Sequence, residues 1–193
     1  ALKSIQIPKG TERIQGNAFF GCTSLKEVSL PDSLVYLGRG VFDDTAFFDE
    51  KDNWKDNGLY SGNNLIAVKE DSERFAVSEN TVCIADDAFI DCFVLTEVTI
   101  GGDRFGVLYN VTNLKTLILT ELPNRICEYF QYYEYHIPTT LDSVVLKQGC
   151  MIENQWMFEN ISGVTVYVEE IENNVMWDLD YPGWNNGNTV YYG

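Results

Sequence analysis

The sequence has few basic residues and a single histidine, His136. Its 13 Lys and Arg residues stand against 29 Asp and Glu, which gives a formal net charge of −16 at pH 7. A surface with this charge repels phosphate backbones, so the composition argues against nucleic acid or an anionic membrane surface as a partner. No apolar run approaches the roughly 20 residues of a membrane-spanning helix, so we expect no membrane insertion.

Cysteine patterns that signal disulfides or zinc are also missing. The chain has five cysteines, an odd number, and none of them forms a Cys-x-x-Cys spacing. This argues against a disulfide framework and against a structural zinc site. Cys22 and Cys92 fall at equivalent positions of a repeat, so we interpret them as small buried thiols that fill the core.

Catalytic and nucleotide-binding motifs are absent as well. There is no Gly-x-Ser-x-Gly, Gly-x-Gly-x-x-Gly or Walker motif, and a nucleophile–histidine pair would depend on His136 alone. The acidic stretch 43–56 raises a calcium hypothesis, but its spacing does not fit an EF-hand loop. We therefore predict that the protein is not an enzyme and has no catalytic residues, no cofactor and no metal site.

What the sequence does contain is a recurring apolar pattern. Six apolar positions recur at an offset of 23: Leu2, Ile5, Ile7, Ile14, Ala18 and Phe19 correspond to Leu25, Val28, Leu30, Leu37, Val41 and Phe42. An offset of 70 carries Cys22, Leu25, Val28 and Leu30 to Cys92, Leu95, Val98 and Ile100. A period in this range is typical of a solenoid, in which each unit buries its apolar face only by stacking on its neighbours.

The unit Ala-Phe-x-x-Cys-x-x-Leu-x-x-Val-x-Leu-Pro, which ends at Pro31, resembles the BspA-like leucine-rich repeats of bacterial surface proteins. The resemblance is strong over 1–48 and 75–100, and only a strand pattern continues over 101–168. It implies an α/β-type leucine-rich repeat solenoid with a curved parallel β-sheet of about seven short strands and one β-hairpin insertion. Turns and short helical or extended segments would form the other face.

Two segments depart from the repeat. The third unit loses its strand near 51–53, and the following residues predict a hairpin that turns at Gly62-Asn63, so we expect an irregular insertion over 43–74. The tail, 169–193, has no repeat phase, and we expect it to cap the last strand. The whole chain, 1–193, is expected to form a single domain.

A binding surface is easier to place than a catalytic site. Residues that flank the inward pair on each strand should face outward, and from 116 onward these become more apolar. A Tyr-rich insert adds rigid contact area. The candidate contacts are Glu97, Thr99, Thr116, Ile118, Val145 and Tyr167 on the sheet and Tyr132, Tyr133 and Tyr135 in the insert. Alternatively, the insert or the tail folds across this face and buries it.

The resemblance implies a non-enzymatic protein that is secreted or displayed at the cell surface and is linked to adhesion. We expect a scaffold that binds protein, such as a host-matrix or surface protein, through its sheet face and the aromatic insert. The first alternative is a carbohydrate-binding or cell-wall-associated module, with Trp54, Trp156 or Trp177 as a sugar-stacking platform. The second is an architectural spacer within a longer surface protein.

Overall fold

The structure, a computed structural model, describes residues 1–101, 108, 111–120, 138, 140–147, 162–169, 187 and 189–192. The chain divides into two compact units. The first unit contains Ala1–Ser72 and Ser78–Cys92, and the second contains Glu73–Val77 and Phe93–Gly193. The architecture is a parallel-strand solenoid with little helix, as the repeat pattern predicted. Among the described residues the expected single sheet of about seven strands is not formed, because the parallel strands are divided between two-stranded sheets and one six-stranded sheet. That all of 1–193 acts as a single domain stays a prediction.

Parallel strand pairs open the first unit. Their register joins residues 23 positions apart, for example Ile5 and Val28, so the sequence offset is the structural repeat. Phe19 stacks on Phe42, its counterpart at the same offset, with ring centroids 5.5 Å apart. The pairs are β1 (Ser4–Gln6) with β3 (Glu27–Ser29), and β2 (Arg13–Ile14) with β4 (Tyr36–Leu37).

The third repeat diverges at Thr45, which occupies the cysteine position of the pattern. The Thr45 hydroxyl donates to the carbonyl of Phe42 at 2.6 Å and accepts from the backbone N–H of Phe48 at 3.2 Å. This second bond caps the short helix α1 (Ala46–Asp49). The 3-10 turn η1 (Lys51–Asn53) then occupies the place where the repeat would have its strand, as the loss of pattern there predicted.

A β-hairpin follows, as predicted. It turns at Gly62, whose φ of 59° suits the first position of a two-residue turn and is open to glycine without strain. A four-stranded sheet forms around it, in the order β5 (Trp54–Lys55), β6 (Gly58–Ser61), β7 (Asn64–Val68) and β9 (Cys83–Ile84). β5, β6 and β7 pair antiparallel, whereas β9 joins β7 parallel.

The hairpin takes the place of the missing strand beside β3. The buried hydroxyl of Ser61 donates to the carbonyl of Val28 at 2.8 Å and accepts from the N–H of Leu30 at 3.1 Å. In an uninterrupted sheet, backbone groups of the next strand would satisfy this carbonyl and this N–H. One serine side chain therefore satisfies two backbone groups at the edge of β3.

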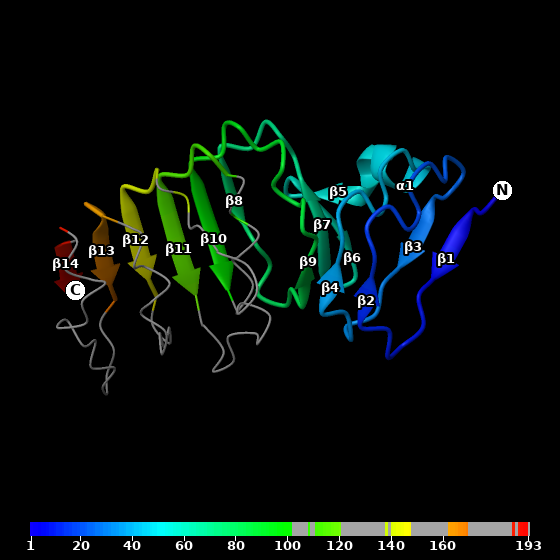
Figure 1. The fold of residues 1–193 in the computed structure, drawn as a ribbon, viewed down its shortest axis with the longest axis horizontal. Helices are drawn as coiled ribbons and strands as arrows, with labels where there is room; N and C mark the ends of the chain where they lie inside the picture. The colour runs from blue at the N-terminus through cyan, green and yellow to red at the C-terminus, as the bar shows by residue number, and fades with distance from the viewer. Residues whose placement is uncertain are drawn as a thin grey trace. The chain divides into compact units, whose positions relative to one another are not determined.

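The second unit is a six-stranded parallel sheet, whose strands lie side by side and point the same way in Figure 1. Its inward residues alternate with outward ones, and the inward ones, such as Ile100, Leu119 and Val144, are fully buried. In spatial order the strands are β8 (Arg74–Ala76), β10 (Glu97–Gly101), β11 (Thr116–Thr120), β12 (Ser143–Leu146), β13 (Thr165–Val168) and β14 (Thr189–Tyr192).

Cys92 fills the core as interpreted from the repeat. It is buried, and its thiol lies 3.7 Å from the carbonyl oxygen of Val68. Burial, together with the nearby carboxylates of Asp91 and Glu70, raises the pKa of Cys92 to about 11. Because the thiolate is the reactive form, this cysteine is chemically inert at neutral pH. Cys22, at the equivalent position of the first repeat, is half-buried.

The tail contains a strand that the sequence analysis missed. β14 continues the parallel sheet and pairs with β13 in register, for example Tyr191 with Tyr167. The remainder of the predicted 169–193 cap lies outside the described residues, apart from 169 and 187, so its capping role stays a prediction.

The role of Ser61 can be tested with Ser61→Ala. This change leaves the carbonyl of Val28 and the N–H of Leu30 without their hydrogen bonds at a buried site. We expect the free energy of unfolding to fall by about 1–3 kcal/mol. Urea unfolding followed by circular dichroism measures the change.

The matched control is Ser29→Ala, because Ser29 is an exposed serine on β3 itself. It should change the free energy of unfolding by less than about 0.5 kcal/mol. Equal effects of the two substitutions would contradict the assigned role of Ser61.

Candidate functional site

The outward side chains of the second unit form rows across the sheet, because the strands are parallel and in register. The strand pairing aligns Glu97 with Thr116, and Thr99 with Ile118. The first row is polar and consists of Arg74, Glu97, Thr116, Ser143, Thr165 and Thr189. The second row consists of Ala76, Thr99, Ile118, Val145, Tyr167 and Tyr191.

The second row becomes apolar and aromatic toward β14. Ile118 and Val145 are half-buried among their neighbours, Tyr167 is 47% exposed and Tyr191 is 55% exposed. These four residues are here called the apolar stripe. Among the described residues nothing covers the two tyrosines. The structure thus brings four of the predicted contact residues, Thr99, Ile118, Val145 and Tyr167, into one row, and whether they bind a ligand stays a prediction.

Tyr191 was not among the predicted contacts. Its ring stacks on that of Tyr167, with centroids 5.6 Å apart and an interplanar angle of 17°. A signal for it exists in the sequence: Thr-Val-Tyr-Val at 165–168 recurs as Thr-Val-Tyr-Tyr at 189–192, an offset of 24. The tail therefore carries one more strand of the repeat, which the irregular spacing of the later units concealed.

Glu97, Thr99 and Thr116 are the predicted contacts on the sheet outside the stripe, and all three are half-buried. They lie on adjacent strands near the stripe, and the hydroxyls of Thr116 and Ser143 share a hydrogen bond of 3.1 Å. The predicted contacts in the aromatic insert, Tyr132, Tyr133 and Tyr135, lie outside the described residues.

Trp54 packs against Phe48 within the first unit. Its indole N–H donates to the carbonyl of Phe48 at 2.8 Å, and its ring packs edge-on against the Phe48 ring. The indole is half-buried and therefore offers a poor platform for a sugar. The other two tryptophans of the carbohydrate hypothesis, Trp156 and Trp177, lie outside the described residues.

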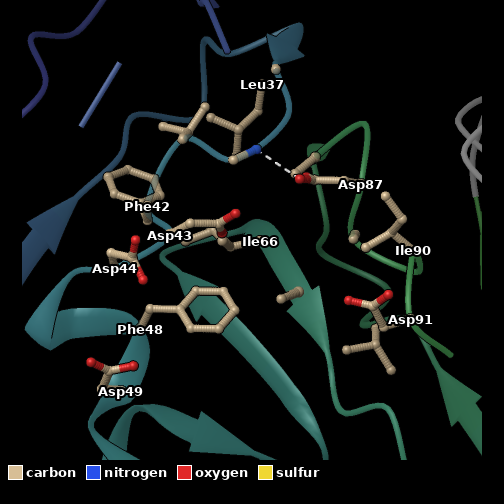
Figure 2. Close-up of a pocket in the computed structure, with 17 residues that line it drawn as sticks. Leu37, Phe42, Asp43, Asp44, Phe48, Asp49, Ile66, Asp87, Ile90 and Asp91 are labelled. Atoms are coloured by element: carbon tan, nitrogen blue, oxygen red, sulfur yellow. Dashed lines mark hydrogen bonds between the residues drawn. The ribbon is translucent and has the colours of Figure 1, made fainter. Parts of the chain in front are cut away.

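A cavity of about 330 Å³ lies in the first unit (Figure 2). Phe42, Phe48 and Ile66 contribute apolar surface to it, and none of its lining residues is basic. In Figure 2 its carboxylates come from two sides, the segment that leads into and through α1 and the loops after β9. They belong to Asp43, Asp44, Asp49, Asp87 and Asp91.

The carboxylates of this cavity are held in surroundings that oppose their ionisation. Partial desolvation of the carboxyl raises the pKa of Asp43, although the residue as a whole is exposed, and the negative charges of Asp87, Asp44 and Asp91 raise it further. Burial also raises the pKa of Asp87, although its carboxylate accepts a 2.7 Å hydrogen bond from the N–H of Gly40, which opposes the rise.

The calcium hypothesis gains nothing from this arrangement. The cavity gathers three residues of the acidic stretch 43–56, namely Asp43, Asp44 and Asp49. Within the described part of the chain, however, no group of three or more acidic, histidine or cysteine side chains is placed to hold a metal ion. Figure 2 shows why, since the labelled carboxylates do not converge on one point.

Comparison with known proteins bears on the family. The sequence profile of the BspA-type leucine-rich repeat region matches residues 1–105 as six copies. The chain belongs to the BspA-type leucine-rich repeat family. Among curated proteins, none matches the chain.

A solved structure of a leucine-rich repeat protein from Bacteroides ovatus is similar to this chain, with 17% sequence identity and a TM-score of 0.29. The match covers 99% of this chain and 61% of that one, so the chain spans about three fifths of the length of that protein.

Membership of the BspA-type family fits a protein-interaction module. Leucine-rich repeats of this type are generally non-catalytic scaffolds, and proteins that carry them are typically secreted or displayed at the surface. No helix in the described residues is long and apolar enough to cross a membrane.

The raised pKa of Asp43, caused by partial burial of its carboxyl and by the neighbouring negative charges, predicts a pH-dependent effect of Asp43→Asn. Because the pKa of Asp43 is higher in the folded state than its ordinary value of 3.8, ionising this carboxyl opposes folding. The free energy of unfolding is therefore unaffected below about pH 3.8 and decreases as the pH rises through the folded-state pKa. The substitution removes that loss. The variant should therefore be more stable than the wild type at pH 7, and the difference should vanish as the pH falls below about 3.8.

Urea midpoints measured across this pH range test the expectation. Asp71→Asn is the control, because Asp71 is exposed like Asp43 but does not line the cavity, and both substitutions make the net charge less negative by one. An Asp43→Asn variant that is no more stable at pH 7 than Asp71→Asn would show that the cavity carboxylates do not oppose folding.

Proposed function

We propose that this chain is a non-enzymatic, extracellular scaffold that binds another protein through the sheet face of its second unit. The observation that carries the proposal is the apolar stripe, with its stacked and exposed pair Tyr167 and Tyr191. Large apolar side chains that lie contiguously on a water-facing surface tend to mark an interface.

The stripe has physical properties that suit recognition. Its side chains stand on neighbouring parallel strands, so their spacing is fixed by backbone hydrogen bonds and not by a loop. Tyrosine supplies a large contact area at a small loss of side-chain entropy, since it has two rotatable side-chain bonds. A partner therefore meets a preorganised surface, which lowers the entropy lost on binding.

The proposed setting follows from the family. Because BspA-type repeat proteins are typically secreted or surface-exposed, we place this chain outside the cell and propose an adhesive role toward host-matrix or other surface proteins. The aromatic insert with Tyr132, Tyr133 and Tyr135 is a further proposed contact. The carbohydrate alternative is weakened by Trp54, whose indole is held by Phe48.

The proposal predicts that Ile118→Asp combined with Tyr167→Asp weakens binding. Two carboxylates within the stripe would be desolvated by any partner that covers it. Affinity should fall about tenfold or more, measured by surface plasmon resonance against a panel of purified extracellular-matrix proteins.

The control is Val94→Asp, which introduces an aspartate at an apolar residue of the second unit that is as exposed as Tyr167 but lies off the sheet. It should bind like the wild type. A second variant, Ile118→Thr with Tyr167→Thr, places β-branched threonine, which suits strands, at both positions. It separates a binding defect from a folding defect. If the wild type and the stripe variants bind every panel member equally, the stripe is not the interface.

A further inference from the structure

The charges on the sheet face of the second unit are paired with one another. Arg74 and Glu97 in the first outward row are 4.0 Å apart. On the other side of the apolar stripe, at the ends of β12 and β13, Lys147 pairs with Glu169. The charges of these two basic and two acidic side chains therefore sum to zero on the face.

Charged residues just before the strands are also paired with one another. Lys115 and Asp142, which immediately precede β11 and β12, form an ion pair of 3.6 Å, and the Lys115 ammonium also donates to the carbonyl of Thr140 at 3.2 Å. Between these pairs the first row carries hydroxyls, and two of them, on Thr116 and Ser143, bond to each other. As far as the structure describes them, the surroundings of the stripe are thus polar but close to neutral.

This local neutrality contrasts with the chain as a whole. The formal net charge is −16, and in the first unit a single cavity collects five aspartates. Among the described residues, the acidic side chains nearest the apolar stripe are each paired with a basic one, so that part of the chain places no excess of acid against it. Because partners match the potential of the surface they cover, a strongly basic partner would gain little from this face.

The dimensions of the stripe limit the shape of its occupant. Its four residues stand on four successive strands, β11 to β14, and neighbouring strands lie about 4.8 Å apart, which gives a length of roughly 14 Å. An extended chain rises about 3.3 Å per residue, so about four residues cover this length. The hydroxyl row beside the stripe can bond the backbone of a segment lying along it.

We propose that the occupant of the apolar stripe is an extended, uncharged segment of a partner protein that bears aliphatic or aromatic side chains. The inference rests on the function proposed above and names the chemistry of its partner. Apolar contacts hold such a segment on Ile118, Val145 and the two tyrosines, and the overall acidity of the chain does not drive the association.

Synthetic peptides of about nine residues test this chemistry, since they exceed the length of the stripe. One set alternates Tyr, Ile or Val with Ser or Thr, and a matched set replaces the Ser and Thr with Lys. Binding to the full chain is measured by fluorescence anisotropy at about 50 mM and about 500 mM NaCl, a range that strongly changes screening.

The neutral set should bind the wild type and Val94→Asp alike. It should lose about tenfold or more in affinity for Ile118→Asp with Tyr167→Asp, and change less than about twofold between the two salt concentrations. Glu169→Gln, which removes the acidic partner of Lys147 and makes the face net positive by one charge, should leave this binding unchanged.

Two results overturn the inference. The first is a neutral set that shows no binding dependent on the stripe. The second is a lysine set that binds more tightly through the stripe and loses about tenfold in affinity at the higher salt concentration. The matrix-protein panel is a separate readout: binding there that depends on the stripe but is sensitive to salt leaves the proposed function intact and removes only the neutral partner.

Discussion

The parallel hydrogen-bonded register of the six strands is the constraint on which the second unit depends. Because side chains alternate across a strand, a register that buries Ile100, Leu119 and Leu146 necessarily turns Thr99, Ile118 and their row outward. A slip of one residue would exchange the two faces and expose the core. The burial that stabilises the sheet therefore also fixes the position of the apolar stripe.

The first unit meets the same constraint in a different way. Its third repeat does not form the expected strand, so the edge of β3 would be left with unsatisfied backbone groups. The hairpin β6–β7 covers that edge, and the hydroxyl of Ser61 serves both Val28 and Leu30. Thr45 caps the helix at which the insertion leaves the repeat. Ser61 bonds the insertion back to β3. The insertion is thus integrated into the solenoid by side chains rather than by a regular ladder.

Much of this fold could be predicted from sequence because the repeat makes its own register visible. The offset of 23 became the pairing of β1 with β3, and the Gly62-Asn63 hairpin was recognised from its turn residues. β14 was missed because the spacing of the later units varies, although its Thr-Val-Tyr pattern copies that of β13. The acidic cavity was beyond prediction, because it joins Asp43 and Asp87, which a linear reading does not bring together.

The candidate contacts show the same division. Alternation along each strand was enough to place Ile118, Val145 and Tyr167 on one face, since that placement follows from strand geometry alone. Their solvent exposure and the charges around them, in contrast, depend on residues of neighbouring strands. The pairing of Arg74 with Glu97, for example, joins residues of different repeats. Composition alone gives only an acidic net charge, whereas the ion pairs described on the face are the basis for proposing a neutral partner.

The most direct test of this account is disulfide formation between Tyr167→Cys and Tyr191→Cys. Residues paired in register on neighbouring strands lie about 4.8 Å apart, within the range that a disulfide spans, and both side chains are exposed to a mild oxidant. The account predicts that this pair cross-links rapidly and that Tyr167→Cys with Thr189→Cys, offset by two residues, does not. Efficient cross-linking of the offset pair with none in the aligned pair would contradict it.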